Sequence, residues 1–230
     1  MNVVLFGATG MVGQGVLREC LLDPDVSLVL TVGRSASGVQ HPKLREIVHQ
    51  DLWHYAAIEN DLSGFDACFF CLGVSSNGMT EKDYAHVTYG ITLAAAEVLC
   101  RLKPQMTFIY VSGAGTDSSE HGRSMWARVK GRTENALMEL PFAAAYMFRP
   151  AIIQPLYGAR SRTTFYRVFY TLTKPLLPWL RRAFPDHVLT TQQIGQAMLT
   201  VARDGYPKRV LTSKDIRALL GDRAYVESHF

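Results

Sequence analysis

The chain opens with a short apolar segment that leads directly into three evenly spaced glycines. Residues 3–6 have the composition of a buried strand, and Gly7, Gly10 and Gly13 follow in the pattern Gly-x-x-Gly-x-x-Gly. Beyond them, apolar residues recur at helical spacing. A strand that turns sharply into a helix leaves unpaired N–H groups at the helix start, where the helix dipole adds partial positive charge. Because glycine lets a ligand approach the backbone closely, this local pattern predicts a pyrophosphate site.

The glycine spacing differs from the Gly-x-Gly-x-x-Gly fingerprint of dinucleotide-binding folds. A tight strand-to-helix turn without a ligand is therefore the alternative interpretation. The fingerprint requires a strand before the glycines and a helix after them, and both are predicted here, which favours a dinucleotide site. The residues expected to bind the cofactor at this loop are Gly7, Thr9, Gly10, Met11, Val12 and Gly13.

Predicted strands and helices alternate along almost all of the 230 residues. This alternation predicts a single Rossmann-like α/β domain over residues 1–230, with a doubly wound, mostly parallel sheet in the strand order 3-2-1-4-5-6-7. Thr80 is expected to cap the longest helix, which Pro104 ends. The predicted strands cover residues 2–6, 26–32, 44–48, 66–72, 106–111, 143–149 and 209–211, and the predicted helices cover 81–103, 124–140, 191–203 and 212–220.

The segment 155–188 departs from the alternation and is predicted to form a small C-terminal annex on the substrate side of the cofactor. It is rich in proline and aromatic residues and contains most of a run of basic residues without an acidic one. A basic amphipathic helix within 163–184 could contact an anionic membrane surface weakly. Aromatic residues interleaved with arginines could instead stack on nucleic acid bases, although we favour packing of the aromatics on the sheet and expect no nucleic acid partner.

The residues after the second predicted strand bear on which dinucleotide is bound. In dinucleotide folds a carboxylate about 20 residues past the glycine loop binds the ribose 2′-hydroxyl, whereas arginine accommodates a 2′-phosphate. Here Gly33, Arg34 and Ser35 follow the strand and no carboxylate is present. Since Arg34 can pair with phosphate in a bidentate manner, NADP(H) is favoured over NAD(H). The alternative is a solvated arginine at a strand end.

Further motifs lie at the ends of the later predicted strands and on one helix. They are Asp51-Leu52, Cys71-Leu72-Gly73, Tyr110-Val-Ser112-Gly, Lys130-Gly-x-x-Glu134 and Arg149-Pro150. Together with the glycine loop, these motifs resemble the atypical short-chain dehydrogenases/reductases of the NAD(P)-binding epimerase/dehydratase-like superfamily, in particular the group around the Tat-interacting protein. The resemblance implies that Asp51 and Leu52 lie beside the adenine, that Leu72, Gly73, Val74 and Ser75 lie beside the ribose and nicotinamide, and that Arg149 and Pro150 lie beside the nicotinamide.

In that family the catalytic set is Ser with Tyr-x-x-x-Lys. The tyrosine exchanges a proton with the substrate oxygen, the lysine one helical turn later lowers the pKa of the phenol, and the serine orients the carbonyl. Ser112 and Lys130 match this set, but Trp126 stands at the tyrosine position. Indole has no accessible ionisation, so Trp126 cannot act as a general acid or base. The resemblance also implies that Lys130 hydrogen-bonds the nicotinamide ribose.

Three interpretations of Trp126 remain open. In the first, another group such as Tyr84, Tyr157, Ser124 or a water molecule supplies the proton. In the second, the cofactor has a structural role. In the third, Trp126 only packs against its neighbours. The function expected is accordingly that of an NADP(H)-dependent oxidoreductase acting on a small carbonyl or alcohol substrate. The alternative is a cofactor-binding regulatory or interaction protein with little turnover. Helices 81–103 and 124–140 could pair in a homodimer.

The location expected from the sequence is cytoplasmic. Met1 leads directly into the first predicted strand, which leaves no room for a leader peptide, and no apolar run is long enough to span a membrane. The four cysteines fall in predicted strands and helices and are expected to be reduced thiols. The seven histidines show no metal-ligand spacing, so no metal is expected.

Overall fold

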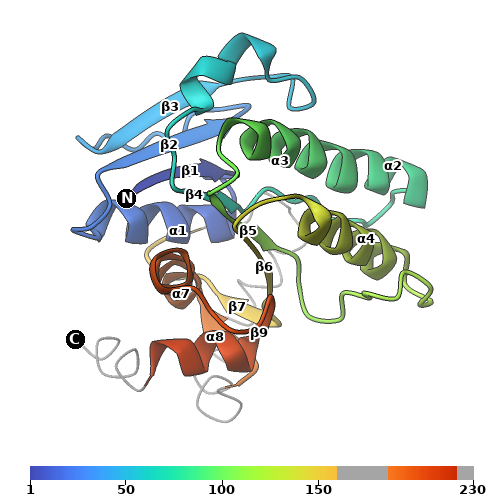
Figure 1. Cartoon of the computed structure of the whole chain (residues 1–230). Helices are drawn as coiled ribbons and strands as arrows, with labels where there is room; N and C mark the ends of the chain where they lie inside the picture. Colours follow the sequence, from blue (N-terminus) through green and yellow to red (C-terminus); the bar gives the residue numbers. More distant parts are fainter. Residues whose placement is uncertain (160–185, 222–230) are drawn as a thin grey trace.

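A seven-stranded parallel sheet forms the centre of the molecule (Figure 1). The computed structural model describes residues 1–159 and 186–221. The strand order is β3-β2-β1-β4-β5-β6-β9, which confirms the Rossmann-like α/β class and the predicted order. The strands of this sheet are β1 (Asn2–Phe6), β2 (Leu28–Gly33), β3 (Leu44–Val48), β4 (Ala67–Phe70), β5 (Thr107–Val111), β6 (Ala144–Arg149) and β9 (Val210–Thr212).

Helices cover both faces of the sheet, as Figure 1 shows. On one face lie α1 (Met11–Leu22), α7 (Thr191–Asp204) and α8 (Ser213–Leu220). On the other lie α2 (Glu81–Ala85), α3 (Ile91–Leu102) and α4 (Met125–Glu139), and a 3-10 helix (Ala56–Leu62) connects β3 to β4. A doubly covered parallel sheet requires strands that are apolar on both faces. Val3, Val4, Leu5 and Phe6 of β1 are accordingly all fully buried.

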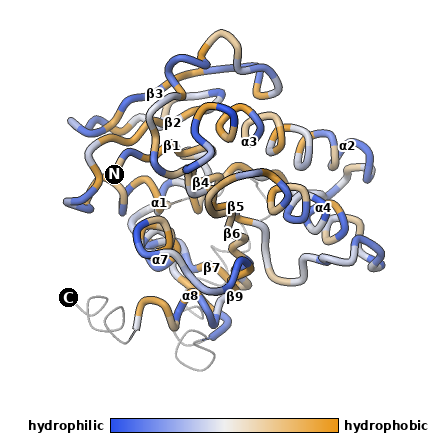
Figure 2. Tube along the Cα trace, viewed as in Figure 1, coloured by the Kyte–Doolittle hydropathy of each residue, from blue (hydrophilic) through white to orange (hydrophobic). Residues whose placement is uncertain are grey.

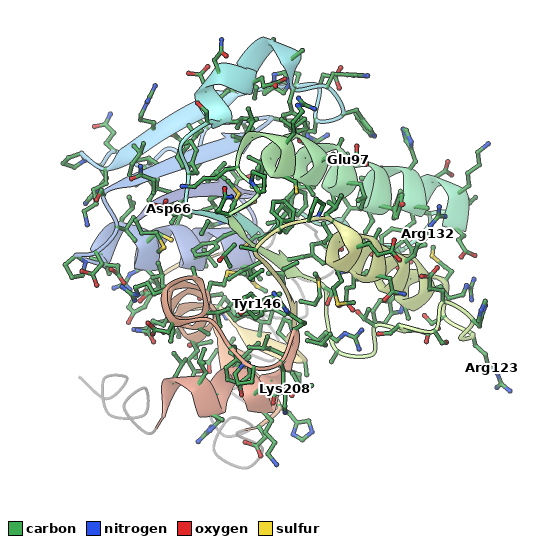
Figure 3. All side chains as sticks on the ribbon, in the orientation of Figure 1. Asp66, Glu97, Arg123, Arg132, Tyr146 and Lys208 are labelled. Carbon is green, nitrogen blue, oxygen red and sulfur yellow. The ribbon has the colours of Figure 1, made fainter. Side chains whose placement is uncertain are left out.

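The buried side chains form two hydrophobic clusters, one on each face of the sheet. Val16, Ile194 and Met198 belong to the cluster under α1 and α7, and Leu99 and Leu137 to the one under α3 and α4. Apolar residues fill the strands and the inner helix faces in Figure 2, whereas polar residues lie along the outer surface. In Figure 3, Glu97 and Arg123 project outward, and Tyr146 lies inside the molecule.

The predicted helix over 81–103 contains an irregular turn. Thr80 caps it as expected, since its side chain accepts a hydrogen bond from the Asp83 N–H. Between α2 and α3, residues His86–Gly90 form a π-helical turn, which sequence periodicity does not reveal. The hydroxyl of Thr88 in this turn is buried without a hydrogen-bond partner among the described residues. The turn packs against α4, so the irregularity adjoins the helix that contains Lys130.

The predicted annex is only partly described. Strand β7 (Ile152–Gln154), just before the annex, pairs in parallel with β8 (Val188–Thr190) at its end, and this small second sheet leads into α7. Most of the basic and aromatic run, including the region 163–184 proposed to contact a membrane, lies outside the described residues. None of the helices within 1–159 and 186–221 is long and apolar enough to span a membrane.

Helix α7 packs closely on α1, although the two helices lie at opposite ends of the chain. Two glycines permit the approach: a Cβ at Gly15 would lie 2.5 Å from the Cβ of Thr191, and one at Gly195 would lie 2.8 Å from the Cγ of Glu19. Arg203 of α7 adds ion pairs to Asp23 and Asp25, which follow α1. The helix after the glycine loop is therefore held by the sheet and by the C-terminal part of the chain.

Candidate functional site

The loops that contain the predicted site residues all follow the carboxyl ends of parallel strands. Strand β1 lies at the centre of the sheet, and the chain proceeds outward from it through β2 and β3 in one direction and through β4 and β5 in the other. The boundary between β1 and β4 is therefore a topological switch point. In open α/β sheets ligands bind outside the carboxyl ends of the strands at such a point.

The glycine loop lies at this switch point and is too tightly packed for side chains. Gly7 has φ +80°, and a Cβ there would lie 2.6 Å from the backbone nitrogen of Leu72 after β4. A Cβ at Gly13 would lie only 2.0 Å from the Gly7 carbonyl oxygen, so the first turn of α1 packs directly on the loop. The Gly10 N–H donates to that same oxygen at 2.9 Å. Glycine is thus required here by the fold itself.

No side chain within residues 1–159 and 186–221 caps the N-terminus of α1. Gly10 occupies the N-cap position, and the first turn contains no acidic residue. The amide of Gln14 donates to the Thr9 carbonyl at 2.9 Å, which fixes the loop against the helix. Met11 and Val12 are half-buried at the helix start. Backbone N–H groups without a capping carboxylate or hydroxyl, together with the helix dipole, form an anion site.

At the end of β2, Arg34 is exposed and its carbonyl accepts a hydrogen bond from the Gln50 amide at 2.9 Å. The sequence places no carboxylate after β2, but the structure brings one close from the neighbouring strand. Glu46 of β3 accepts hydrogen bonds from the Thr31 hydroxyl at 2.9 Å and the Ser37 N–H at 2.8 Å. Glu46 therefore orders the loop that presents Arg34, a role that only strand pairing reveals.

The predicted adenine-binding residues follow β3. The Asp51 carboxylate accepts from the Trp53 N–H at 3.0 Å and contacts the His54 ring nitrogen at 2.8 Å. These hydrogen bonds, chiefly that with His54, lower the pKa of Asp51. Leu52 is buried, so only its backbone can face a ligand. The carboxylate of Asp51 thus orders its own turn.

The residues after β4 form the other side of the switch point. Leu72 packs against Gly7, and Gly73 and Val74 are exposed. The Ser75 hydroxyl accepts a long hydrogen bond from the Asn77 N–H at 3.3 Å. The structure therefore brings the predicted ribose- and nicotinamide-side residues next to the glycine loop.

A buried network joins β5, α4 and β6. The Ser112 hydroxyl donates to the Glu134 carboxylate at 2.5 Å and approaches the Phe148 carbonyl at 3.1 Å. Arg149 donates hydrogen bonds to the same carboxylate from its Nε and one terminal nitrogen, and it also donates to the Ser118 hydroxyl. Glu134 is completely buried, and a buried carboxylate must be paired with charge and hydrogen bonds. Ser112 and Arg149 supply both.

This network gives Glu134, Ser112 and Arg149 contacts that the sequence does not indicate. Glu134, noted in sequence only as part of a motif, is the centre of the network. Arg149, expected beside the nicotinamide, has its guanidinium engaged by Glu134 and Ser118. Pro150 after it is buried, and its carbonyl accepts from the Ala114 N–H. The position of Glu134 one helical turn after Lys130, on the buried face of α4, is the signal that could have identified it.

Lys130 lies on α4 with its half-buried amine at the end of β5. Its Nζ donates to the Ser112 carbonyl oxygen. Burial lowers the pKa of Lys130 to about 8, and the negative charge of Glu134 only partly opposes that effect. The loop after β5 is fixed on α4, since the Asp117 N–H donates to the Ala127 carbonyl at 3.0 Å. The amine is therefore presented at the same sheet edge as the glycine loop.

Trp126 lies one turn before Lys130. The six-membered ring of its indole lies over Gly115 in the loop after β5, 3.4 Å from where a Cβ at that glycine would be. Of the alternative proton donors, Tyr84 is buried. Ser124 is exposed at the start of α4, where its side chain makes no capping hydrogen bond. Indole chemistry thus leaves this position without an acid or base.

Tyr157 is engaged on the opposite face of the sheet from α4. Its ring stacks on the Arg18 guanidinium of α1 at 3.7 Å, and its hydroxyl donates to the Gln192 side chain of α7 at 3.2 Å. It is also one of two non-glycine residues with positive φ within the described part of the chain, at 54°. These contacts attach the start of the annex to the α1–α7 layer.

A parallel doubly wound sheet with a glycine-rich loop and an open helix N-terminus at its switch point defines the class of Rossmann-type dinucleotide-binding proteins. The sequence comparison gives the family within that class. The chain belongs to the NAD dependent epimerase/dehydratase family, whose sequence model matches residues 3–125. The finer grouping around the Tat-interacting protein stays a prediction.

Curated relatives include the Fmp52 proteins of fungi. FMP52-2 of Scheffersomyces stipitis is 25% identical over 215 residues, which cover 89% of this chain and 88% of the relative. Fmp52 of Emericella nidulans is 28% identical over 159 residues, which cover 66% of each chain. Both are named as mitochondrial proteins. The expected cytoplasmic location is therefore wrong. A first strand that begins at Asn2 is a property of the fold and does not determine the compartment.

Solved structures support the fold. The Bordetella bronchiseptica enzyme WbmF in complex with NAD+ superposes with a TM-score of 0.68 at 18% identity, covering 92% of this chain and 72% of that one. UDP-glucose 4-epimerase from Thermotoga maritima gives a TM-score of 0.66 at 16% identity, covering 92% and 76%. A short-chain dehydrogenase family protein from Francisella tularensis gives 0.64 at 14%, covering 93% and 98%.

Proposed function

We propose that this protein is an NADP(H)-binding oxidoreductase that acts on a small carbonyl or alcohol substrate with a non-standard proton donor. The observation that carries the proposal is the glycine loop with the uncapped N-terminus of α1 at the β1–β4 switch point. A pyrophosphate fits there because side chains are excluded at Gly7 and Gly13 and the backbone N–H groups have no side-chain cap.

The residues that would hold the cofactor lie along one edge of the sheet. The N–H groups of residues 10–13 would bind the pyrophosphate, and the turn at Asp51 and Leu52 would flank the adenine. Residues 72–75 would line the ribose and nicotinamide, beside Lys130. When bound, the nicotinamide supplies or accepts a hydride. The chain itself supplies position, charge and a proton.

The proposed preference for NADP(H) depends on Arg34. Among the described residues, no hydrogen bond or ion pair engages its exposed guanidinium. The Glu46 carboxylate on the neighbouring strand is already bound by Thr31 and Ser37. Titration of NADPH and NADH by nucleotide fluorescence tests this preference. Arg34→Ala is expected to weaken NADPH binding about tenfold, as for loss of one charged hydrogen-bonded pair, and to leave NADH binding unchanged. Arg45→Ala, an exposed arginine on β3, is the control. Equal affinities of the native protein for both nucleotides would contradict the preference.

Trp126 favours a second candidate function, a cofactor-binding regulatory or interaction protein with little turnover. The indole removes the usual proton-transferring group and closes over Gly115. A panel of aldehydes and ketones followed at the NADPH absorbance, with native protein and Trp126→Tyr, separates the two functions. Turnover by the native protein supports an oxidoreductase. Binding without turnover in either form supports the regulatory alternative.

A further inference from the structure

We propose that Lys130 itself donates and accepts the proton at the reacting oxygen. This role rests on the oxidoreductase function proposed above. Three observations support this role. Trp126 cannot ionise and Ser112 already donates its proton to another group. The Lys130 amine lies at the carboxyl edge of the sheet, and no carboxylate among the described residues forms an ion pair with it.

The first observation concerns the neighbouring candidates. Trp126 has an indole N–H that does not ionise. The Ser112 hydroxyl, which would orient a carbonyl by donating to it, donates to the buried Glu134 carboxylate at 2.5 Å instead. A hydroxyl has a single proton to donate, so Ser112 offers a substrate only its lone pairs while this hydrogen bond persists. The Tyr110 phenol on β5 is buried and hydrogen-bonded to Thr133, which leaves the Lys130 ammonium as the proton donor on α4 and β5.

The second observation is the placement of the amine. Lys130 Nζ donates to the carbonyl of Ser112, the residue that follows β5, and so lies at the carboxyl edge of the sheet. An ammonium has three N–H donors, and this backbone hydrogen bond uses one. The backbone hydrogen bond fixes the amine without neutralising it and leaves two N–H groups for a ligand.

The third observation is the charge balance around the amine. Glu134, one turn away, is bound by Arg149 through two guanidinium nitrogens, and no ion pair to Lys130 occurs within residues 1–159 and 186–221. The amine can therefore lose its proton without breaking a salt bridge, and burial brings its pKa to about 8. The charged and titratable groups on the surrounding elements include Glu134 on α4, Arg149 on β6, Tyr110 on β5, Tyr84 on α2 and Asp117 in the loop after β5, besides Arg128 and Arg132 on α4 and Glu81, Lys82 and Asp83 on α2.

The proton balance is simple. In the direction of reduction, the carbonyl carbon receives a hydride from the reduced nicotinamide and the π electron pair of the C=O bond moves to oxygen. The Lys130 ammonium gives that oxygen a proton, which yields the alcohol, the oxidised nicotinamide and a neutral amine. The amine then regains a proton from water. In oxidation the neutral amine takes the alcohol proton.

Lys130→Arg is the sharpest variant, because arginine keeps the positive charge but does not release a proton near neutral pH. We expect NADPH to bind within about threefold of native affinity and carbonyl reduction to fall at least a hundredfold, as for loss of a general acid. Lys82→Arg, an exposed lysine on α2, is the matched control and should be fully active. Circular dichroism and the retained NADPH binding verify that the Lys130→Arg fold is intact.

A measurement independent of activity uses the native protein. Reductive methylation with ¹³C-formaldehyde labels the lysine amines, and the signal absent in Lys130→Arg is assigned to Lys130. That signal is expected to titrate near pH 8, whereas ordinary lysine titrates near about 10.4. The rate of reduction by native protein should fall as pH rises through the same value, because the ammonium is the donor.

The outcomes separate this inference from the proposed function. If the native protein binds NADPH but shows no turnover, the oxidoreductase function is contradicted, and so is the proton role of Lys130. Turnover by native protein together with an active Lys130→Arg overturns the proton role alone. So does a Lys130 signal that titrates as an ordinary lysine. The proton role is supported if the pKa of Lys130 is lowered and the Lys130→Arg variant binds NADPH but is inactive.

Discussion

Two loops at the same edge of the sheet are built in opposite ways. At the β1–α1 loop, Gly7, Gly10 and Gly13 leave three positions without a side chain, and backbone N–H groups line the start of α1. At the β5–α4 edge the site consists of side chains, with the Glu134 carboxylate bound by Ser112 and Arg149. The first loop depends on the absence of side chains at its three glycines, whereas the second depends on which side chains contact one another in the folded protein.

The difference explains how each loop tolerates change. A backbone site fails when any Cβ is added, whereas a side-chain network fails when one charged member is lost and its partners stay buried. The glycine loop also matches a ligand that is the same throughout a broad class of proteins. In the proposed function, the side-chain edge would face the reacting part of a substrate, where Trp126 replaces the tyrosine expected from the resemblance.

The largest effect is expected from Glu134→Ala. It leaves the Arg149 guanidinium without its buried carboxylate partner, so the free energy of unfolding should fall by about 3–5 kcal/mol. Urea unfolding measures this loss. Glu139→Ala, exposed at the end of the same helix, should change stability by less than about 0.5 kcal/mol. Similar small losses in both variants would mean that the network does not hold this edge.

Gly13→Ala tests the backbone-built loop. The added Cβ would lie 2.0 Å from the Gly7 carbonyl oxygen, so α1 must shift, and unfolding should become easier by about 1–3 kcal/mol. Since the shift moves the N–H groups of α1, NADPH binding should also be lost in a fluorescence titration. Gly33→Ala, where a Cβ has ordinary space, is the control. Unchanged NADPH binding in Gly13→Ala would contradict the assigned pyrophosphate site.

Ser112→Ala separates structure from catalysis at the second loop. The hydroxyl bonds Glu134 and the Phe148 carbonyl, but Glu134 keeps Arg149, so a loss of about 1 kcal/mol is expected. Ser124→Ala, whose hydroxyl makes no capping hydrogen bond at the start of α4, should be neutral in urea unfolding. If Ser112→Ala had native stability and no turnover, the serine would instead act on the substrate.

The smallest effect is a dependence of stability on pH. Because burial holds the pKa of Lys130 at about 8, the native protein has released this proton at a pH where the unfolded chain still binds it. Stability therefore gains a contribution that rises with pH between about 8 and 10. Lys130→Met should flatten this rise in unfolding measured from about pH 7.5 to about 9.5. Lys82→Met should keep the native slope, and an unchanged slope in Lys130→Met would refute the shift.

The main sheet was predictable because its central strands are apolar on both faces and several helix boundaries have their own signal. Pro104 follows the longest helix, and the Thr80 cap lies where its sequence indicates. The β7–β8 pair was missed, because three-residue strands separated by more than thirty residues have no local pattern. The π-helical turn at 86–90 was missed because it leaves the apolar periodicity almost unchanged.

For the site, the sequence indicated which positions lie at the edge of the sheet but not what their side chains contact. Arg149 and Ser112 were expected to face the ligand, and both are engaged by Glu134. That outcome depends on the rotation of α4 relative to β5 and β6, which no local pattern determines. Glu46 was missed for the same reason, since it meets Thr31 only through strand pairing.

The close contact of α1 with α7 has a consequence for how the chain acquires its structure during synthesis. Helix α1 leaves the ribosome well before α7, since Thr191 and Gly195, against which it packs, follow some 176 residues later. Contacts so distant in sequence form slowly and leave apolar surface exposed meanwhile. The nascent chain must therefore carry α1 half-covered until α7 has been synthesised, a period in which chaperones would have their greatest influence.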